Sequence, residues 1–198
     1  MPTTDSITHS WRRRVKARWR GAWLLAGVLC LVPSIAGAQS ASISTAQLEA
    51  TEDGYQLNAD IDLQLTDGMQ EAVRKGVPLY FIVEFQLTRG RWYWLDQGVI
   101  SATRDRRISY APLTDQYRIA VSGISQNVSS FDDVRRVLSR IRSWTVAEKG
   151  QLRPGEKYEA ALRFRLDTSQ LPKPFQLNVI TSKEWSLSSE WHRWSVTP

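Results

Sequence analysis

An alternating run of apolar residues early in the chain restricts the fold more than any other feature of the sequence. Such alternation is typical of a β-strand that buries one face, because successive side chains point to opposite sides of a sheet. A polar turn at Arg89-Gly90 and a second aromatic segment follow, so 79–97 is predicted to form a β-hairpin in the core. The alternating residues are Leu79, Phe81, Val83, Phe85 and Leu87.

The register of this hairpin decides where two tryptophans point. A two-residue turn at Arg89-Gly90 places Trp92 opposite Leu87 and Trp94 opposite Phe85, on the apolar face. A shift of one residue instead turns both tryptophans outward, where they would form an exposed binding surface for a ligand. We expect the first register.

Alternation continues along most of the chain. Strands are expected at 42–50 and 55–65, which form a hairpin, and then as three short strands at 99–105, 106–113 and 115–121. Further strands are expected at 157–167, 175–182 and 184–194. The absence of alternating long helices argues against βαβ units, so we predict an all-β, mainly antiparallel, immunoglobulin-like β-sandwich with two short helices.

The two helices are predicted from their caps and apolar faces. Asp67 with Gln70 resembles a capping box, Met69, Ala72 and Val73 form one apolar face, and Gly76 ends this first helix. Ser130 with Asp133 predicts the start of the second. Its apolar face comprises Val134, Val137, Leu138 and Ile141, and its other face carries Arg135, Arg136, Arg140 and Arg142.

Residues 1–38 have the three parts of a secretory signal. Six basic residues precede a short apolar run at 22–32, and Pro33 and the small residues Ala36-Gly37-Ala38 follow. We expect cleavage after Ala38, one domain over 39–198, and a periplasmic or secreted protein. The alternative is an uncleaved leader that anchors the chain in the inner membrane. We expect any contact with a membrane to be made through such a leader.

The charge of the chain bears on its binding partners, and its cysteine content bears on disulfides. Residues 1–38 hold six of the 26 Lys and Arg and one of the 20 Asp and Glu, so the remainder has a formal charge of +1. A nucleic-acid partner therefore has no electrostatic basis. The single cysteine, Cys30, lies in the leader, so structural disulfides are excluded.

No residue pattern points to catalysis, a cofactor or a metal. His192 is the single histidine after the leader, and a triad or zinc site needs partners that it lacks, so we interpret it as a half-exposed strand residue. Glu84 and Asp96 fall on opposite faces of the predicted hairpin, the wrong geometry for a glycosidase pair. We expect Glu84 to pair with Arg163 or Arg165 on a solvated face.

Six tryptophans remain after the leader, and they are the least ordinary feature of the composition. Most are expected in the core, where large aromatics dominate. If exposed, Trp92, Trp94 and Trp191 would form a binding surface with Arg163 and Arg165, since Trp and Arg are favoured at binding hot spots. The arginine face of the second helix is interpreted as solvated, although it could also attract anionic lipid or an acidic partner.

Four motifs in order resemble a known bacterial family. They are KGVPLYFIVEFQL, RWYWLDQ, LTDQYR and LDTSQLPKPFQLN, and they cover most of the chain behind the leader. The chain resembles the bacterial envelope proteins called domain-of-unknown-function family 4390. The resemblance implies no activity, substrate or catalytic residues. It does imply an envelope role, because genes of the family often neighbour one for a membrane-bound sensor histidine kinase.

The sequence therefore favours a non-enzymatic binding or accessory protein of the cell envelope with an envelope protein as its partner. Two other classes stay open: an envelope enzyme that acts on glycan or lipid through carboxylates, and a periplasmic partner of a membrane sensor kinase. An enzyme would gather polar residues in one cleft, whereas a binding module would present an exposed patch.

Overall fold

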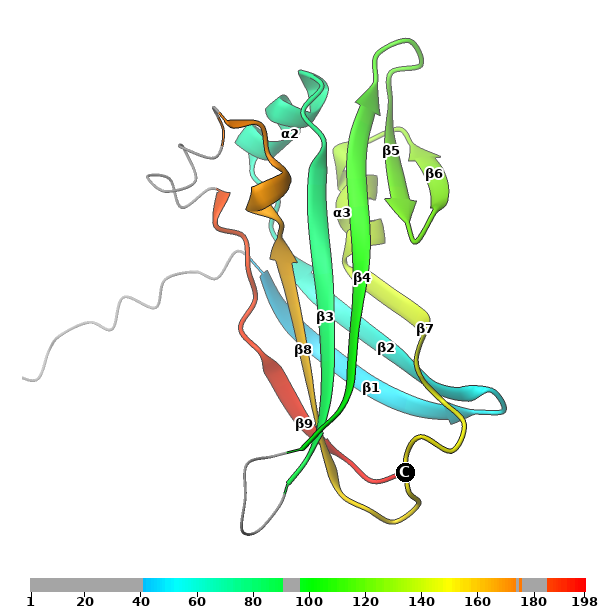
Figure 1. Ribbon diagram of the computed structural model, residues 1–198. Helices are drawn as coiled ribbons and strands as arrows, with labels where there is room; N and C mark the ends of the chain where they lie inside the picture. The colour runs from blue at the N-terminus through cyan, green and yellow to red at the C-terminus, as the bar shows by residue number, and fades with distance from the viewer. Residues whose placement is uncertain (1–40, 91–96, 174, 176–184) are drawn as a thin grey trace, which may run out of the picture. The chain divides into compact units, whose positions relative to one another are not determined.

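Two antiparallel sheets contain all the strands in the described part of the computed structural model, which comprises residues 41–90, 97–173, 175 and 185–198. These residues belong to one compact unit, Ala38–Pro198. In Figure 1 the larger sheet lies in front and the strands of the smaller sheet cross behind it. The predicted mainly antiparallel β-sandwich with two short helices is confirmed.

The smaller sheet has the order β1-β2-β7 and the larger sheet β6-β5-β4-β3-β8-β9. The smaller sheet comprises β1 (Ala41–Thr51), β2 (Gly54–Leu63) and β7 (Arg140–Glu148). The larger sheet comprises β3 (Leu79–Arg89), β4 (Gln97–Ala111), β5 (Gln116–Val121), β6 (Ile124–Val128), β8 (Tyr158–Leu166) and β9 (His192–Val196). The helices are α2 (Asp67–Arg74), α3 (Phe131–Leu138) and the 3-10 turn η1 (Thr168–Gln170).

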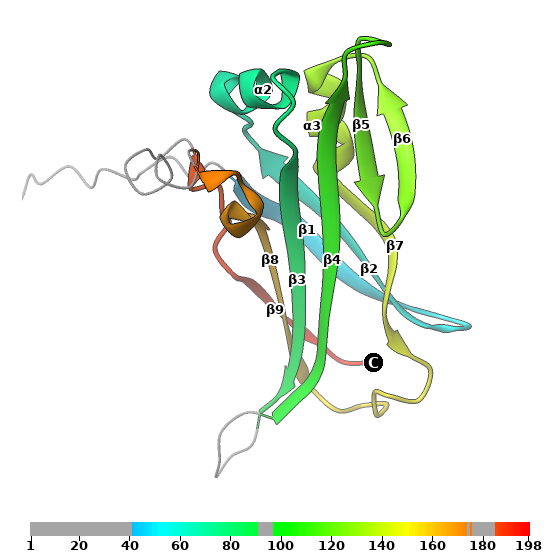
Figure 2. The ribbon, with the colours of Figure 1, turned by 45° about the horizontal axis from the view of Figure 1, so that its top comes forward.

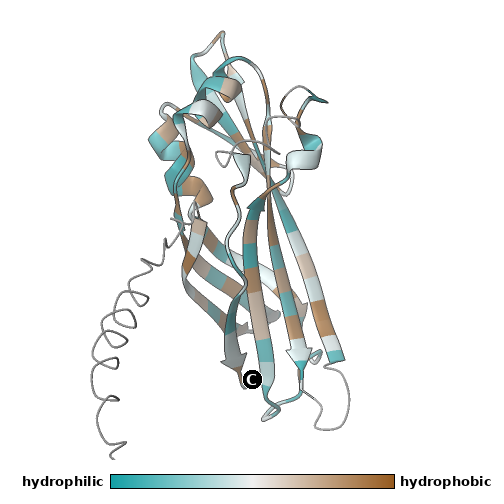
Figure 3. Ribbon diagram, turned by 90° about the vertical axis from the view of Figure 1, so that its left-hand side faces the viewer, coloured by the Kyte–Doolittle hydropathy of each residue, from teal (hydrophilic) through white to brown (hydrophobic). Residues whose placement is uncertain are grey.

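The core lies between the facing sides of the two sheets. Figure 3 shows the sheets from one edge, with apolar and polar residues alternating along the strands. The alternation predicted for β3 and β8 is confirmed, because the inward residues of both strands are buried. The aromatic rings of Phe81 and Phe164 stack at 5.4 Å across these neighbouring strands. From the smaller sheet the same cluster receives Leu57, Ala59, Ile61, Leu63, Ile141 and Trp144.

The central hairpin differs from the prediction in its register. Leu87 pairs with Ile100 and Phe85 with Ala102, and Arg89 pairs with Gln97. A two-residue turn at Arg89-Gly90 is therefore wrong, since the connection between the two strands is longer. Trp92 and Trp94, which were expected opposite Leu87 and Phe85, lie outside the described residues.

Strand β4 is also longer than predicted. The expected separate strands at 99–105 and 106–113 are one continuous strand, Gln97–Ala111. It pairs with β3 over nearly its whole length and with β5 from Arg106 to Ala111. The charged run at 104–107, which indicates a turn when read as sequence alone, is held in strand conformation by these two ladders.

Helix α2 begins one residue earlier than predicted. The side chain of Thr66, not that of Asp67, accepts the backbone N–H of Met69 and caps the helix. The predicted apolar face is confirmed, since Met69, Ala72 and Val73 are buried. Figure 2 shows α2 and α3 together at the end of the sandwich where β4 and β5 turn.

Helix α3 has the predicted cap but ends sooner. The hydroxyl of Ser130 accepts the N–H of Asp133 at 3.1 Å, which is the first bond of a capping box. The same hydroxyl also donates to the Asp133 carboxylate at 2.7 Å. The helix ends at Leu138, and Ile141 belongs to β7, where it pairs with Ala59 of β2. Arg140 and Arg142 therefore lie on β7 and not on the helix, because pairing with β2 outweighs the helical pattern.

In the described part of the chain no helix is both long and apolar enough to cross a lipid bilayer.

Candidate functional site

The outer face of the larger sheet, meaning the side that points away from the smaller sheet, carries the sequence-predicted site residues that the structure describes. On β3, Glu84 points outward because its neighbours Val83 and Phe85 point into the core. Pairing places Arg163 of β8 directly beside Glu84, and Arg165 one step along beside Ile82. The alternation of β3 and β8 therefore brings one carboxylate and two guanidinium groups together.

Glu84 binds both arginines. Arg163 approaches one carboxylate oxygen at 2.6 Å, and Arg165 approaches the other at 3.2 Å. The Glu84 side chain is 20% exposed and each arginine 32%, so these ion pairs are partly shielded from water. Burial alone would raise the pKa of Glu84, but hydrogen bonds from Arg163 and Arg165 lower it overall. The predicted pairing of Glu84 with these arginines is confirmed.

Trp191 joins this group from the segment before β9. The central carbon of the Arg163 guanidinium lies 4.5 Å from the centre of the Trp191 ring, which is cation–π distance. Arg163 is thus held on one side by a carboxylate and on the other by an aromatic face, and Trp191 stays half-exposed. We call Glu84, Arg163, Arg165 and Trp191 the outer-face cluster. A binding role for Trp191, Arg163 and Arg165 stays a prediction.

A shallow hollow of about 380 Å³ adjoins the cluster on the same face. Ile82 lines it and pairs with Arg165 on the neighbouring strand, so the hollow lies beside the cluster. Arg107 lies over the Tyr80 ring at 5.6 Å, a second arginine–aromatic pair on this face. Asp105 and Asp167 also line the hollow.

His192 and the remaining described tryptophans lie on the core side. His192 is half-exposed on β9, as predicted, opposite Leu162, and its ring centre is 5.6 Å from that of Trp194. Trp144 and Trp185 are buried and Trp194 packs against Phe85, so the core interpretation is confirmed for these three. Among the described residues no group of three or more His, Cys, Asp or Glu could hold a metal ion.

The arginines that remain on α3 form local ion pairs. Arg135 pairs with Asp132 at 3.3 Å, and Arg136 pairs with Asp133. Both arginines are exposed, as expected for a solvated face, and the attraction of this side to anionic lipid or an acidic partner is not tested by these contacts. Asp96, the proposed partner of Glu84 in a carboxylate pair, lies outside the described residues.

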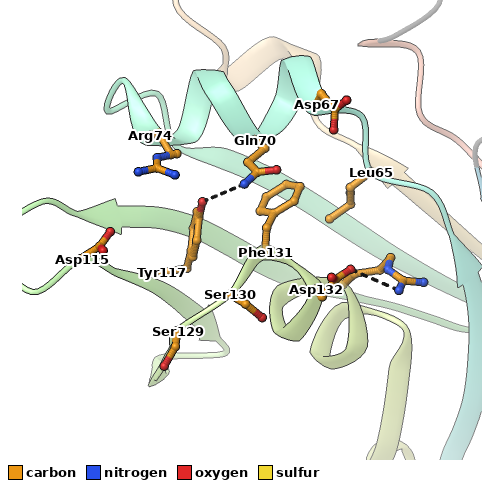
Figure 4. A pocket seen from close by; sticks show the side chains of 11 residues that line it. Leu65, Asp67, Gln70, Arg74, Asp115, Tyr117, Ser129, Ser130, Phe131 and Asp132 are labelled. Atoms are coloured by element: carbon orange, nitrogen blue, oxygen red, sulfur yellow. Dashed lines mark hydrogen bonds and ion pairs between the residues drawn. The ribbon is translucent and has the colours of Figure 1, made fainter.

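A cavity of about 480 Å³ between α2 and α3 was missed from the sequence (Figure 4). We call it the helix cavity. Three residues of α2, namely Asp67, Gln70 and Arg74, line one side, and Tyr117 of β5 and Phe131 of α3 lie below them. These residues are up to 64 positions apart in sequence, and only the docking of both helices against β5 brings them together.

Arg106 is the second feature that the sequence did not reveal. It is 3% exposed on the inner side of β4 and donates to the backbone oxygens of Val137, Leu138 and Arg140. Arg104, two residues earlier on the same side, stacks on Trp144 at 4.9 Å. The only hint in the sequence was that Arg104 and Arg106 share the parity of Ile108, which is an inward position.

The fold and the outer face define a class: a mainly antiparallel β-sandwich with an arginine–aromatic surface on its larger sheet. The chain belongs to the family described as "Domain of unknown function (DUF4390)", whose model matches residues 38–195, and this confirms the resemblance seen in the sequence. Neither the comparison with curated proteins nor that with solved structures finds a match.

Proposed function

We propose that this protein is an exported, non-enzymatic binding or accessory module of the bacterial cell envelope, and that the outer-face cluster is its contact surface. The observation that carries the proposal is the fixed position of Arg163 between Glu84 and Trp191. A planar guanidinium held in advance on a half-exposed ring loses little conformational freedom when a partner binds. Arg and Trp are also the residue types that dominate binding hot spots.

The electrostatics of the cluster support binding rather than acid catalysis. A glycosidase needs a general acid whose pKa is raised so that it holds a proton near neutral pH. The pKa of Glu84 is lowered by its two arginine partners, so this carboxylate is ionised at neutral pH. Glu84 is thus suited to orient Arg163 and Arg165 and not to donate a proton.

Export is supported by the pattern of residues 1–38. A basic segment, an apolar run and the small residues before position 39 together form a cleavable signal. Mass spectrometry of the protein from the native envelope should find a chain that begins at Gln39. A chain that still begins upstream of Gly21 would contradict cleavage and favour the anchored alternative.

Site-specific crosslinking in intact cells tests the contact surface. A photo-crosslinking residue at Gln86, exposed on the outer face next to Glu84, should capture an envelope protein, and the product should decrease strongly when Trp191→Ala is added. The same group at Glu49, which is exposed on β1 of the smaller sheet, is the matched control. Equal capture at both positions, or no capture at Gln86, would contradict the proposal.

The identity of the captured molecule distinguishes the remaining functional classes, which are the accessory module, the partner of a sensor kinase and the enzyme. A membrane sensor kinase would assign the protein as the periplasmic partner of that kinase. Any other envelope protein would assign it as an accessory module of that assembly. Capture of glycan or lipid with turnover of the bound material would instead favour the enzyme.

A further inference from the structure

The helix cavity combines side chains of opposite charge at its two ends. Asp67 and Arg74 stand seven residues apart on α2, and Gln70 lies between them (Figure 4). Residues at i, i+3 and i+7 share one side of a helix, so a carboxylate, an amide and a guanidinium form a single stripe. With a rise of 1.5 Å per residue, the two charged positions are about 10 Å apart along the helix axis.

The charges at the ends of this stripe have no counter-ion of their own. Among the described residues neither Asp67 nor Arg74 forms an ion pair with another side chain, and Arg74 only lies over the ring of Tyr110 at 5.6 Å. The arginine on the opposite side of the cavity, Arg135, is already paired with Asp132. Asp115, a further carboxylate of the cavity wall, accepts a hydrogen bond from the hydroxyl of Tyr110. Asp67 and Arg74 are therefore the lining charges that have no ion pair or hydrogen bond with another side chain among the described residues.

The floor of the cavity offers uncharged polar and aromatic contacts. Tyr117 is 4% exposed, and its hydroxyl accepts a long hydrogen bond of 3.4 Å from the side-chain amide of Gln70. The hydroxyl proton of Tyr117 and the amide oxygen of Gln70 are thus a donor and an acceptor that can serve a ligand amide. The Phe131 ring, 5.5 Å from that of Tyr117, gives an apolar surface beside them.

From this arrangement we infer that the helix cavity is a binding site for a short peptide-like zwitterion, whose carboxylate meets Arg74 and whose ammonium group meets Asp67. An extended peptide rises about 3.3 Å per residue, so about three residues span the roughly 10 Å between the two charges. The volume of about 480 Å³ lies within the range of small-ligand sites. The Tyr117 and Gln70 groups then face the central peptide bond.

This site is separate from the outer-face cluster and does not rest on the proposed function. A titration of the isotopically labelled protein, expressed from the full chain, with trialanine tests it by NMR. The backbone amides of 67–74 and of Tyr117 should shift with a dissociation constant in the millimolar range or below. Because Asp67 and Arg74 are exposed, acetylation of the ammonium group or amidation of the carboxylate should each weaken binding by up to about fivefold, the loss expected for one solvent-exposed ion pair.

Two variants test which residue contacts each charged end of the ligand. Arg74→Gln should lose the preference for the free carboxylate over the amide but keep the preference for the free ammonium group, and Asp67→Asn should show the reverse. Arg118→Gln, an exposed arginine on β5 outside the cavity, is the control and should bind like the unaltered protein. A thermal melt of each variant confirms that it is folded.

Three results would overturn the inference. The first is no shift of the α2 amides at about 10 mM trialanine, which means an affinity weaker than the millimolar range. The second is equal binding of the free, acetylated and amidated peptides. The third is loss of both preferences in a folded Arg74→Gln variant, because that variant removes only the carboxylate contact.

Discussion

Among single residues, Arg106 is unusual because its charged side chain is buried in the core. Its guanidinium donates hydrogen bonds to backbone oxygens at the C-terminal end of α3, at 3.1 Å to Val137 and 2.9 Å to Leu138. Burial, and then the neighbouring charge of Arg104, lower its pKa to about 10. It therefore stays protonated at neutral pH, and the negative end of the helix dipole partly offsets its desolvation.

Replacing this side chain should be costly. Arg106→Ala removes three hydrogen bonds to backbone oxygens and opens a cavity, so we expect the free energy of unfolding to fall by about 3 kcal/mol or more. Arg107→Ala, the adjacent exposed residue, should cost less than about 1 kcal/mol. Urea denaturation of both variants measures the difference. Similar losses would mean that the contacts of Arg106 with the end of α3 contribute little.

Glu84 makes stability depend on pH. Because its pKa is lower in the folded chain than in the unfolded chain, its stabilising effect is complete above the unfolded value of about 4.3. The effect is lost as the pH falls through the lower folded value. Glu84→Gln should cost about 1 kcal/mol at pH 7, since part of each side chain still contacts water, and the cost should shrink as the pH falls from about 5 to about 3.

Urea denaturation across this pH range checks the prediction. Glu49→Gln, an exposed residue of β1, should change stability little at any of these pH values. A cost for Glu84→Gln that does not vary with pH would show that the side chain stabilises the sheet through packing and not through its charge.

Residue patterns predicted some of these contacts and missed others for a physical reason. The pairing of Glu84 with Arg163 and Arg165 follows from alternation along two strands, which is a local property. The position of Arg106 depends on where α3 ends, about 30 residues later, and a charged run such as 104–107 favours an exposed interpretation on composition alone. The helix cavity was missed for the same reason, because its walls come from separate elements.

Among the elements, strand faces were predictable and strand lengths were not. Alternation fixes which residues of β3 and β8 point inward, and the capping pair at Ser130 fixes the start of α3. The end of α3 and the register of the β3–β4 hairpin depend on pairing partners. Ile141 fits a helical stripe and a buried strand position equally well, and only its pairing with Ala59 decides between them.

The hairpin of β1 and β2 depends on a single glycine. Gly54 has φ +145°, and a β-carbon there would overlap the backbone oxygen of Ala147 in β7. We expect Gly54→Ala to lower the free energy of unfolding by about 3 kcal/mol or to prevent folding, because the clash with backbone adds to the strain of a positive φ.

Gly123→Ala is the matched control for this substitution. Gly123 also has a positive φ, +87°, but no atom lies within 4 Å of an added β-carbon, so only the conformational cost of about 1 kcal/mol should remain. Urea denaturation of both variants separates crowding from backbone strain. Equal costs would show that β7 moves aside at Gly54.

In the whole sandwich the two sheets share one hydrophobic core. Leu57 of the smaller sheet and Phe85 of the larger sheet are both completely buried in it. Leu57→Ala and Phe85→Ala should therefore each lower the free energy of unfolding by about 2–5 kcal/mol, and each variant should still unfold in a single transition. Circular dichroism and tryptophan fluorescence should report coincident urea curves for both variants. Two separate transitions would mean that the sheets unfold independently.

The arginines on the inner side of β4 also affect how copies of the chain meet one another. In the described part of the chain, the segment of β4 at 98–105 forms a ladder with β3 and none with β5, so this stretch of its other edge is not covered by β5. Exposed edges of this kind attract further strands and lead to aggregation. A foreign strand added here would have to bury the guanidinium of Arg104, which is charged. The inward arginine thus disfavours the addition of a further strand along the part of β4 that β5 does not cover.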